Sequence, residues 1–527
     1  MRQRYEVVVV GAGPVGLSTA LFLAEQGVRV AVVDKRDPMN APPRASTSVR
    51  TLELFRSIGL GPALDRVGWD GPAPLCSVFK DSAVGSVLYT AAPPARYARR
   101  LATCSPVSIR RAVTQYEVQR VVMDALRRGG GRVRFGVELT ALDVTETGVR
   151  ATVSDTETGT RERLSCAYLI GADGARSLVR RLLGVGMPDR RVAARPNTAF
   201  FRADLGRLLP ESASHSCFIR NERVYCTLFA KGADGTRWSS HILDYPGKPA
   251  ELTTLTPERT IGLLHAAIGD DSVPIELIEC NAWEAAFGLA STFRAGRVFL
   301  AGDAAHTQSS AGGLGMNTGI QDGHNLAWKL AAVLHGQARD TLLDSYEPER
   351  RAAAEASLAV SERLHHGYQA RRDTTALYAR LAADYLRGML CYRYTGGAVV
   401  ADDEPDADVL DDRVVVGRRL PHRWLTVEGR RLSTLDLVGF GWTLLTGPRG
   451  DAWHAVEKAA DSMVWVRQLT ADQFDGDSAA FTEMAGIEPD GALLVRPDHI
   501  VAWRSPTLPA APEDALRRVL AALLGRA

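Results

Sequence analysis

The sequence of 527 residues lacks the features that mark several classes of protein. It has only seven cysteines, without a Cys-x-x-Cys pair, and no histidine spacing that suits zinc. No apolar run approaches the roughly 18 residues of a membrane span. Charge is nearly balanced, with 63 Lys and Arg against 61 Asp and Glu, so no strong field attracts nucleic acid or an anionic membrane. We therefore expect a cytoplasmic protein with reduced thiols, no metal, no nucleic acid and no membrane partner, acting on a small molecule of little charge.

What is present describes a large, well-packed globular protein. The residues are 46% apolar and 24% charged, which is average for soluble proteins. At about 150 residues per domain, the length predicts three or four folding units. A chain of this size can bury a sizeable core.

A glycine-rich turn near the N-terminus carries the first functional signal. A short β-branched run ends in GAGPVG, apolar residues follow at helical spacing, and residues 29–34 predict a second buried strand. This order predicts a βαβ unit of a parallel sheet. In such a unit Gly11, Gly13 and Gly16 let the backbone approach a pyrophosphate at the helix N-terminus. Asp34 would accept hydrogen bonds from a ribose. We expect a dinucleotide site, with a purely structural glycine turn as the alternative.

Two further acidic residues follow predicted strands. Asp173 lies in YLIGADGARS, and Asp303, after Gly302, lies in GRVFLAGDAAH. A carboxylate just past an apolar strand is useful where it receives donors such as ribose or ribityl hydroxyls. A helix N-cap is the alternative for either residue alone. In this order after a GxGxxG turn, the three motifs together favour one dinucleotide site.

The predicted elements divide the chain into an interleaved, Rossmann-like α/β domain with all three motifs, a mixed β-sheet substrate domain, a linker and a C-terminal unit. The linker is an acidic, proline-containing run. Because every motif precedes it, we expect the C-terminal unit to be separable from cofactor binding. The α/β domain comprises residues 1–74, 105–189 and 286–395, the substrate domain 75–104 and 190–285, the linker 396–412 and the C-terminal unit 413–527.

These motifs, with GGLGMNTGIQDGHNLAWKLA and LLDSYEPERR, resemble those of the class A FAD-dependent aromatic monooxygenases, the family of para-hydroxybenzoate and phenol hydroxylases. The branch that oxygenates aromatic polyketides is the most similar. The resemblance covers residues 1 to about 395 and, more weakly, a thioredoxin-like tail that has no cysteine after Cys391. It implies FAD as cofactor, NADPH or NADH as reductant, and O₂ and an aromatic small molecule as substrates. A homodimer is left open.

The resemblance also assigns roles to individual residues. The glycine turn and Asp34 would bind the ADP half of FAD, with Lys35 beside them and Arg44 facing the pyrophosphate. Gln115 would touch the flavin or the ribityl chain. A surface arginine is the alternative for Arg44, and an ordinary helix residue is the alternative for Gln115.

The second and third motifs complete this assignment. Asp173 would serve both FAD and NAD(P)H, and Asp303, with Gly302 before it, would bind ribityl hydroxyls. Backbone N–H groups at a helix start would stabilise negative charge on the reduced flavin. These groups belong to Gly315, Met316 and Asn317.

One departure from the family lies between these motifs. Relatives carry a proline before AGG that shapes the oxygen pocket, whereas this chain has Ser309 and Ser310. His306, at the start of this loop, is expected to be structural, with a catalytic role as the alternative.

The activity that the resemblance implies is hydroxylation of a phenolic or polyketide-type ring through a flavin hydroperoxide, with substrate binding controlling flavin reduction. Baeyer–Villiger oxygenation or epoxidation on the same scaffold is one alternative, and a flavin-binding protein without oxygenase activity is another. No His, Asp or Cys constellation in residues 190–285 marks a catalytic group, so none is assigned. The aromatic residues of this segment suit a planar ring: Phe200, Phe201, Phe218, Tyr225, Phe229, Trp238 and Trp283.

Overall fold

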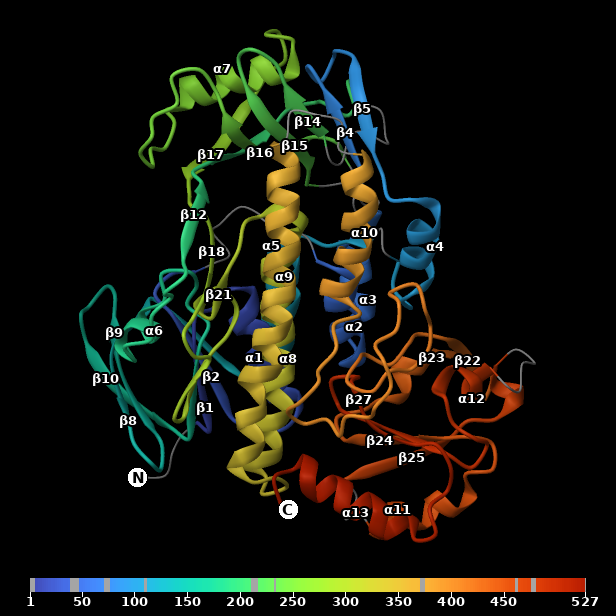
Figure 1. The fold of residues 1–527 in the computed structure, drawn as a ribbon. Coiled ribbons are helices and arrows are strands. Elements are labelled where there is room, and N and C mark those ends of the chain that lie inside the picture. Colours follow the sequence, from blue (N-terminus) through green and yellow to red (C-terminus); the bar gives the residue numbers. More distant parts are fainter. Residues whose placement is uncertain are drawn as a thin grey trace.

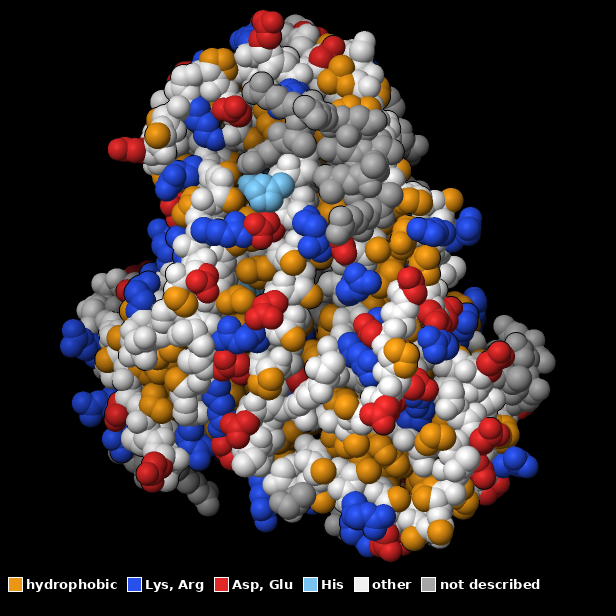
Figure 2. Space-filling model, in the orientation of Figure 1, with side chains coloured by type: hydrophobic (Ala, Val, Ile, Leu, Met, Phe, Trp, Pro, Cys, Tyr) orange, Lys and Arg blue, Asp and Glu red, His pale blue; other side chains and the backbone are white. Residues whose placement is uncertain are grey.

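The computed structural model describes residues 5–37, 47–70, 76–108, 111–209, 217–231, 234–369, 375–459, 463–474 and 480–526. Three parts are distinguished in Figure 1: an α/β part that holds the long helices, a large sheet above it, and a C-terminal part at the lower right. Lys and Arg side chains are interspersed with Asp and Glu over the face in Figure 2, so the nearly balanced charge is also mixed in space.

The α/β part is built on a six-stranded sheet. Its central strand, β1 (Val7–Val10), is buried and pairs in parallel with β2 (Val30–Asp34) and β11 (Tyr168–Gly171). A run of β-branched residues buried on both faces is typical of such a strand. The order is β19 (Arg294–Ala295), β20 (Val298–Leu300), β11, β1, β2 and β7 (Arg132–Phe135). The predicted parallel sheet is therefore confirmed for the strands from β20 to β7, which lie far apart in the chain, while β19 is added antiparallel at one edge.

Helices cover this sheet and continue beyond it. Helix α1 (Pro14–Glu25) starts with a proline, which suits the first helical turn, and packs against α8 (Leu314–Leu334). Helices α9 (Tyr346–Gln369) and α10 (Thr375–Met389) pack side by side and run toward the large sheet (Figure 1). The remaining helices of this part are α2 (Val49–Ser57), α3 (Gly61–Val67), α5 (Gln115–Arg128) and α6 (Leu178–Leu182).

Three small sheets complete the α/β part. The segment predicted as strands near residues 132–144 splits, because β7 joins the parallel sheet while the following residues start a separate antiparallel sheet. That sheet comprises β8 (Val137–Val144), β9 (Val149–Asp155) and β10 (Arg161–Cys166). The others pair β12 (Arg191–Ala194) with β18 (Ala285–Leu289) and β21 (His306–Thr307), and β3 (Trp69–Asp70) with β6 (Arg111–Ala112).

The large sheet has seven strands and two different faces, and it is mixed, as predicted, because β14 and β4 pair in parallel. One face packs against α7 (Pro257–Ile268), and this core contains Phe201 and Trp238. We call the opposite side the inner face; its Phe218 and Tyr225 share a core with Ala311 and Leu314 at the start of α8. The order is β17 (Glu276–Ala282), β13 (Asn197–Arg202), β16 (Arg237–Asp244), β15 (Tyr225–Ala230), β14 (Cys217–Arg220), β4 (Ser77–Lys80) and β5 (Val87–Ala91), and α4 (Ala95–Thr103) follows β5.

The C-terminal part is built on a mixed four-stranded sheet, and its thioredoxin-like character stays a prediction. Its first two strands are parallel, and the third and fourth are added antiparallel. The order is β25 (Val464–Gln468), β24 (Trp442–Thr446), β26 (Ala492–Val495) and β27 (Val501–Ser505). The helices are α11 (His454–Ala459), α12 (Ala480–Ala485) and α13 (Pro512–Leu523), and β22 (Trp424–Val427) and β23 (Arg430–Ser433) form a separate hairpin.

Buried ion pairs join the C-terminal part to the α/β part. Arg419 donates to both carboxylate oxygens of Glu53 at 2.8 and 2.6 Å. On α9, Glu349 accepts from Lys329 at 2.8 Å and from both terminal nitrogens of Arg496, at 2.9 and 2.8 Å. All five side chains are buried. The expectation that the C-terminal unit is separable therefore conflicts with the packing, because its removal would strand buried charges.

The segment predicted as a linker also packs on its neighbours. The Val400 N–H donates to the Ala502 carbonyl at 2.8 Å, and Arg504 donates to Asp402 at 2.6 Å. Arg100 bonds Asp412. Its acidic residues thus pair with arginines of both adjoining parts instead of facing only water. Among the described helices, none is long and apolar enough to cross a membrane.

Candidate functional site

The glycine turn after β1 leaves space where a pyrophosphate would lie. A Cβ on Gly11 would lie 2.3 Å from the Ala172 carbonyl oxygen, and a Cβ on Gly16 would lie 1.9 Å from the Gly11 oxygen. Both glycines are therefore required by the chain itself. A Cβ on Gly13 would meet no protein atom within 4 Å. The backbone is open at this point, at the N-terminus of α1, as a bound phosphate group requires.

Asp34 and Lys35 lie at the end of β2, beside this turn. Asp34 accepts the Ala12 N–H at 2.7 Å on Oδ2 and the Arg36 N–H at 2.9 Å on Oδ1, which fixes its carboxylate at the turn. Lys35 is exposed, and its ammonium pairs with Glu138 at 3.0 Å. Arg44 lies outside the described residues. The assignment of these three residues to FAD stays a prediction.

Gln115 is the first residue of α5 and adjoins the same turn through its neighbour one turn later. Its Nε2 donates to Gln119 Oε1 at 3.2 Å, and Gln119 Nε2 donates to the Ala12 carbonyl at 3.3 Å. Gln119 is buried. The sequence prediction missed Gln119, although it lies one helical turn after Gln115 on the same helix face.

Asp173 caps a helix, which is the alternative that its position left open. Its carboxylate accepts the Ser177 hydroxyl at 2.5 Å and the N–H groups of Leu178 and Val179 at 2.6 and 3.0 Å. Arg180, three residues after Ser177, donates to the Ala304 carbonyl at 2.8 Å. This hydrogen bond joins the segment of the second motif to the segment of the third. A contact between Asp173 and a cofactor stays a prediction.

Asp303 differs from the other acidic residues because no described residue donates a hydrogen bond to it. The side chain is exposed to solvent, yet burial among protein atoms raises its pKa, with His306 acting in the opposite direction. The carboxylate is thus open to solvent while many protein atoms surround it. A Cβ on Gly315 would lie 3.9 Å from Asp303 Oδ1, so the carboxylate faces the first turn of α8.

A buried network that the sequence prediction missed holds the Asp303 loop. Asp322 accepts the Gly302 N–H at 3.0 Å, His306 Nε2 at 2.7 Å and Arg350 Nε at 2.7 Å. Burial alone would raise the pKa of Asp322, but the net effect of His306 and Arg350 is to lower it. His306 is fully buried, as a structural residue would be. A charged residue within the apolar pattern of α8 was the available signal.

The start of α8 is fixed by hydrogen bonds to the neighbouring helices. Asn317 Oδ1 accepts the Ser48 N–H at 2.7 Å and the Thr51 hydroxyl at 2.7 Å. Before the helix, the Ser309 hydroxyl accepts the Ala311 N–H at 3.2 Å and lies 3.1 Å from the Ser361 hydroxyl of α9. The roles of Gly315, Met316 and Asn317 toward a flavin stay predictions. They share this turn, which faces the Asp303 carboxylate.

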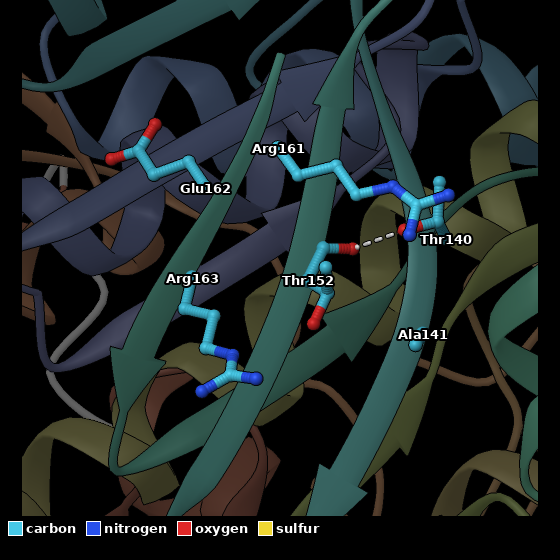
Figure 3. A pocket seen from close by; sticks show the side chains of 6 residues that line it. All are labelled: Thr140, Ala141, Thr152, Arg161, Glu162 and Arg163. Carbon is cyan, nitrogen blue, oxygen red and sulfur yellow. Dashed lines mark hydrogen bonds between the residues drawn. The ribbon is translucent and has the colours of Figure 1, made fainter. Parts of the chain in front are cut away.

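A separate groove of about 430 Å³ lies on the β8–β10 sheet and carries no site. Thr140 donates to the Thr152 carbonyl at 3.1 Å across it (Figure 3). Glu162 pairs with Arg134 at 2.8 Å, and the charged side chains that line the groove are exposed. No residue of the three motifs lines it. Its lining residues are Thr140, Ala141, Thr152, Arg161, Glu162 and Arg163.

Comparison with known proteins agrees with this geometry. The family described as FAD binding domain matches residues 4–361, and the family described as aromatic-ring hydroxylase, C-terminal, matches residues 413–527. Aklavinone 12-hydroxylase RdmE of Streptomyces purpurascens is 36% identical, with 99% of both chains covered. Tetracenomycin A2 monooxygenase-dioxygenase of Streptomyces glaucescens is 34% identical, covering 99% of this chain and 97% of the relative.

A solved structure of similar fold has FAD and a substrate bound. It is a ternary complex of aklavinone-11 hydroxylase with FAD and aklavinone, similar to this chain with a TM-score of 0.88, 34% identity and full coverage of both chains. The open backbone at Gly13 and the unpartnered Asp303 carboxylate fit the same cofactor. The chain belongs to the FAD-dependent aromatic-ring hydroxylases and is an enzyme of the monooxygenase type that binds FAD.

Proposed function

We propose that this enzyme uses NAD(P)H and O₂ to hydroxylate a phenolic or polyketide-type aromatic ring. The observation that carries the proposal is the position of the Asp303 carboxylate at the start of α8, where α8 and the inner face of the large sheet share one core. Relatives named for aklavinone and tetracenomycin support the substrate class. The inner face supplies aromatic side chains on which a planar ring can pack.

Bound FAD would accept a hydride from the nicotinamide and activate O₂. The chain's own residues hold and shield it. The open turn at Gly13 admits the pyrophosphate, Asp303 accepts ribityl hydroxyls, and the N–H groups of the first turn of α8 stabilise negative charge on the flavin ring. Asp322 keeps the Asp303 loop in place through the Gly302 N–H. The sheet excludes water from the substrate.

Mass spectrometry of a labelled reaction tests the proposal. The purified FAD-loaded protein is incubated with a panel of polycyclic phenols, ¹⁸O₂, and either NADPH or NADH. We expect one labelled oxygen atom in an aromatic product and a preference for one nicotinamide. A labelled ring-expanded ester would indicate Baeyer–Villiger chemistry instead, and no label in any product would contradict a monooxygenase acting on this class.

Two finer statements belong with this proposal. We propose that the enzyme works in the cytoplasm, where NAD(P)H is available, and that it forms a homodimer. Analytical ultracentrifugation of the FAD-loaded protein tests the dimer, and a single species of monomer mass would contradict it.

A further inference from the structure

The inner face of the large sheet carries a polar cluster that no step above uses. It comprises Thr198 on β13, Phe229 on β15, Lys231 just after β15, His241 on β16 and Trp283 just after β17. Strand pairing places the cluster on this face. Two cross-strand pairs of β15 and β16 lie in the core against α7: Cys226 with Ile242, and Ala230 with Trp238. The alternate positions therefore point to the inner face.

The Lys231 side chain is largely buried, and no described residue supplies it with an anionic partner. Its side chain is only 8% exposed, and Nζ makes no hydrogen bond to any described residue. It lies 5.9 Å from the centre of the Phe229 ring. Burial lowers the pKa of Lys231 to about 8, and no carboxylate among the described residues opposes that effect. A buried lysine without a partner lowers the stability of a fold unless a ligand supplies the opposite charge.

Two hydrogen bonds join Trp283, Thr198 and His241. The Trp283 Nε1–H donates to Thr198 Oγ1 at 2.8 Å, and Thr198 Oγ1 lies 2.8 Å from His241 Nδ1. Because tryptophan can only donate, the Thr198 hydroxyl is free to donate to Nδ1. Burial, with Lys231 nearby, lowers the pKa of His241 to about 4, so the ring is neutral at pH 7. The remaining proton is then on Nε2, which no described residue accepts.

His241 has the same combination of properties as Asp303. Its side chain is only half-buried, although it lies on an interior face and is strongly desolvated. Phe229 and Trp283 beside it are also half-buried. These side chains are therefore only partly covered on the inner face, where they present a neutral N–H donor and an ammonium.

We propose that Lys231 and His241 form a subsite that binds an anionic oxygen of the aromatic substrate. An ionised phenol or a carboxylate supplies the required charge and accepts from both groups. This inference rests on the proposed function and deepens it, because ionisation makes a phenol ring more electron-rich where oxygen is transferred. Lys231 and His241 act as binding and positioning residues, and no bond is made or broken at either.

Equilibrium dialysis of three probes against the oxidised FAD-loaded protein tests the subsite without NAD(P)H. Alizarin carries an ionisable phenol, anthraquinone carboxylate a carboxylate, and anthraquinone neither. We expect Lys231→Met to weaken binding of at least one anionic probe by about tenfold or more, and anthraquinone by less than about twofold. Lys231→Arg should restore most of the affinity. The visible spectrum of bound alizarin should shift toward the neutral phenol in Lys231→Met.

The matched control is Lys80→Met. Lys80 is a buried lysine of the same sheet, but its ammonium donates to the Ala83 carbonyl at 2.6 Å. Its side chain does not lie on the inner face. We expect this variant to lose stability and keep its affinity for all probes. Lys231→Met should instead gain stability, because it removes an unpartnered buried charge. Thr198→Val removes the hydroxyl that bonds His241 Nδ1. It should weaken binding of the same anionic probe by a smaller factor.

The outcomes separate this inference from the proposed function. Wild-type binding of the anionic probes with no loss in Lys231→Met or Thr198→Val would overturn the subsite alone. Wild-type protein that binds none of the three probes would overturn both the subsite and the proposed substrate class. Loss confined to the carboxylate probe identifies a carboxylate, and loss of alizarin binding identifies a phenolate, as the oxygen that is bound.

Discussion

At the scale of single residues, Asp303 is the acidic residue of the three motifs to which no described residue donates a hydrogen bond. Asp34 and Asp173 accept hydrogen bonds from the backbone, so their charges are used by the fold itself. Asp303 receives none from the described residues, although it is desolvated. A carboxylate that is desolvated and receives no hydrogen bond lowers the stability of the fold. Such a residue indicates a site that binds a ligand.

Asp303→Ala should therefore weaken FAD binding without lowering the stability of the protein. We expect a loss of about 1.5–3 kcal/mol in binding free energy, because the ribityl hydroxyls lose a charged acceptor. The FAD-free protein should keep or gain stability. Flavin fluorescence titration gives the Kd, and Asp143→Ala on the exposed β8 strand is the control. Unchanged flavin affinity would mean that this carboxylate does not contact the ribityl chain.

Ser310 occupies a backbone conformation that proline also adopts. Its φ is −70°, within the range that a proline ring fixes. Ser310→Pro should raise the free energy of unfolding by about 0.4–1 kcal/mol, because proline lowers the conformational entropy of the unfolded chain. FAD affinity should be unchanged. The matched control is Ser309→Pro, which should be destabilising because it removes the hydroxyl that bonds Ala311. Thermal unfolding measures both, and a fall in the melting temperature of Ser310→Pro would contradict the expectation.

At the scale of elements, α8 and α9 owe their positions to buried ion pairs, and Glu349 is central to them. Burial alone would raise the pKa of Glu349, but Arg496 and Lys329 lower it to about 2. Its ordinary pKa is 4.5. A carboxyl whose pKa is lowered by folding stabilises the protein fully above pH 4.5 and loses that contribution as pH falls toward 2.

Glu349→Gln should remove this acid dependence along with the ion pair. We expect a loss of about 3–5 kcal/mol at pH 7, because Lys329 stays buried without a counter-charge and Arg496 keeps only Asp498. The fall in stability between pH 4.5 and 3 should be shallower than in the wild type. Urea unfolding at several pH values measures both, and Glu138→Gln in an exposed pair should cost less than about 1 kcal/mol. An equal slope in the variant and the wild type would refute the role of Glu349.

The elements themselves were largely predictable, and their long-range partners were not. Local patterns placed β1, β2, β11 and β20, because hydrophobic period and glycine turns are local signals. They did not place β22, β23 or α12 of the C-terminal part. The pair of Glu53 with Arg419 joins residues that are 366 positions apart, and nothing in either neighbourhood marks the other. For the same reason the site prediction found Asp303 and missed Asp322, whose three partners come from two other segments.

At the scale of the whole molecule, the C-terminal part completes the protein that binds the flavin. A fragment of residues 1–412 would leave Glu53 and Glu349 buried without Arg419 and Arg496. We expect this fragment to be insoluble or colourless when expressed alone, and co-expression with residues 413–527 to restore yellow protein. Absorbance near 450 nm, about the usual flavin maximum, scores both. A soluble, yellow 1–412 fragment would contradict this and support a separable tail.

Substrate and nicotinamide must reach one flavin in a molecule whose described part contains no second glycine-rich βαβ unit. We expect substrate binding on the inner face to raise the rate of flavin reduction, by about tenfold or more at saturating NADPH, because only a ligand that favours the reducible conformation can shift its population. Stopped-flow absorbance with and without a substrate found by the mass assay measures this. An unchanged rate would contradict substrate control.

The pairing of Glu349 with Arg496 also has a consequence during synthesis of the chain, because the two residues are made at different times. The ribosome makes the carboxylate 147 residues before it makes the guanidinium. Until then Glu349 of α9 has only Lys329 of α8 as a buried cationic partner. A nascent chain that stops before Arg496 therefore lacks one of the two cations that this carboxylate needs in the finished interior.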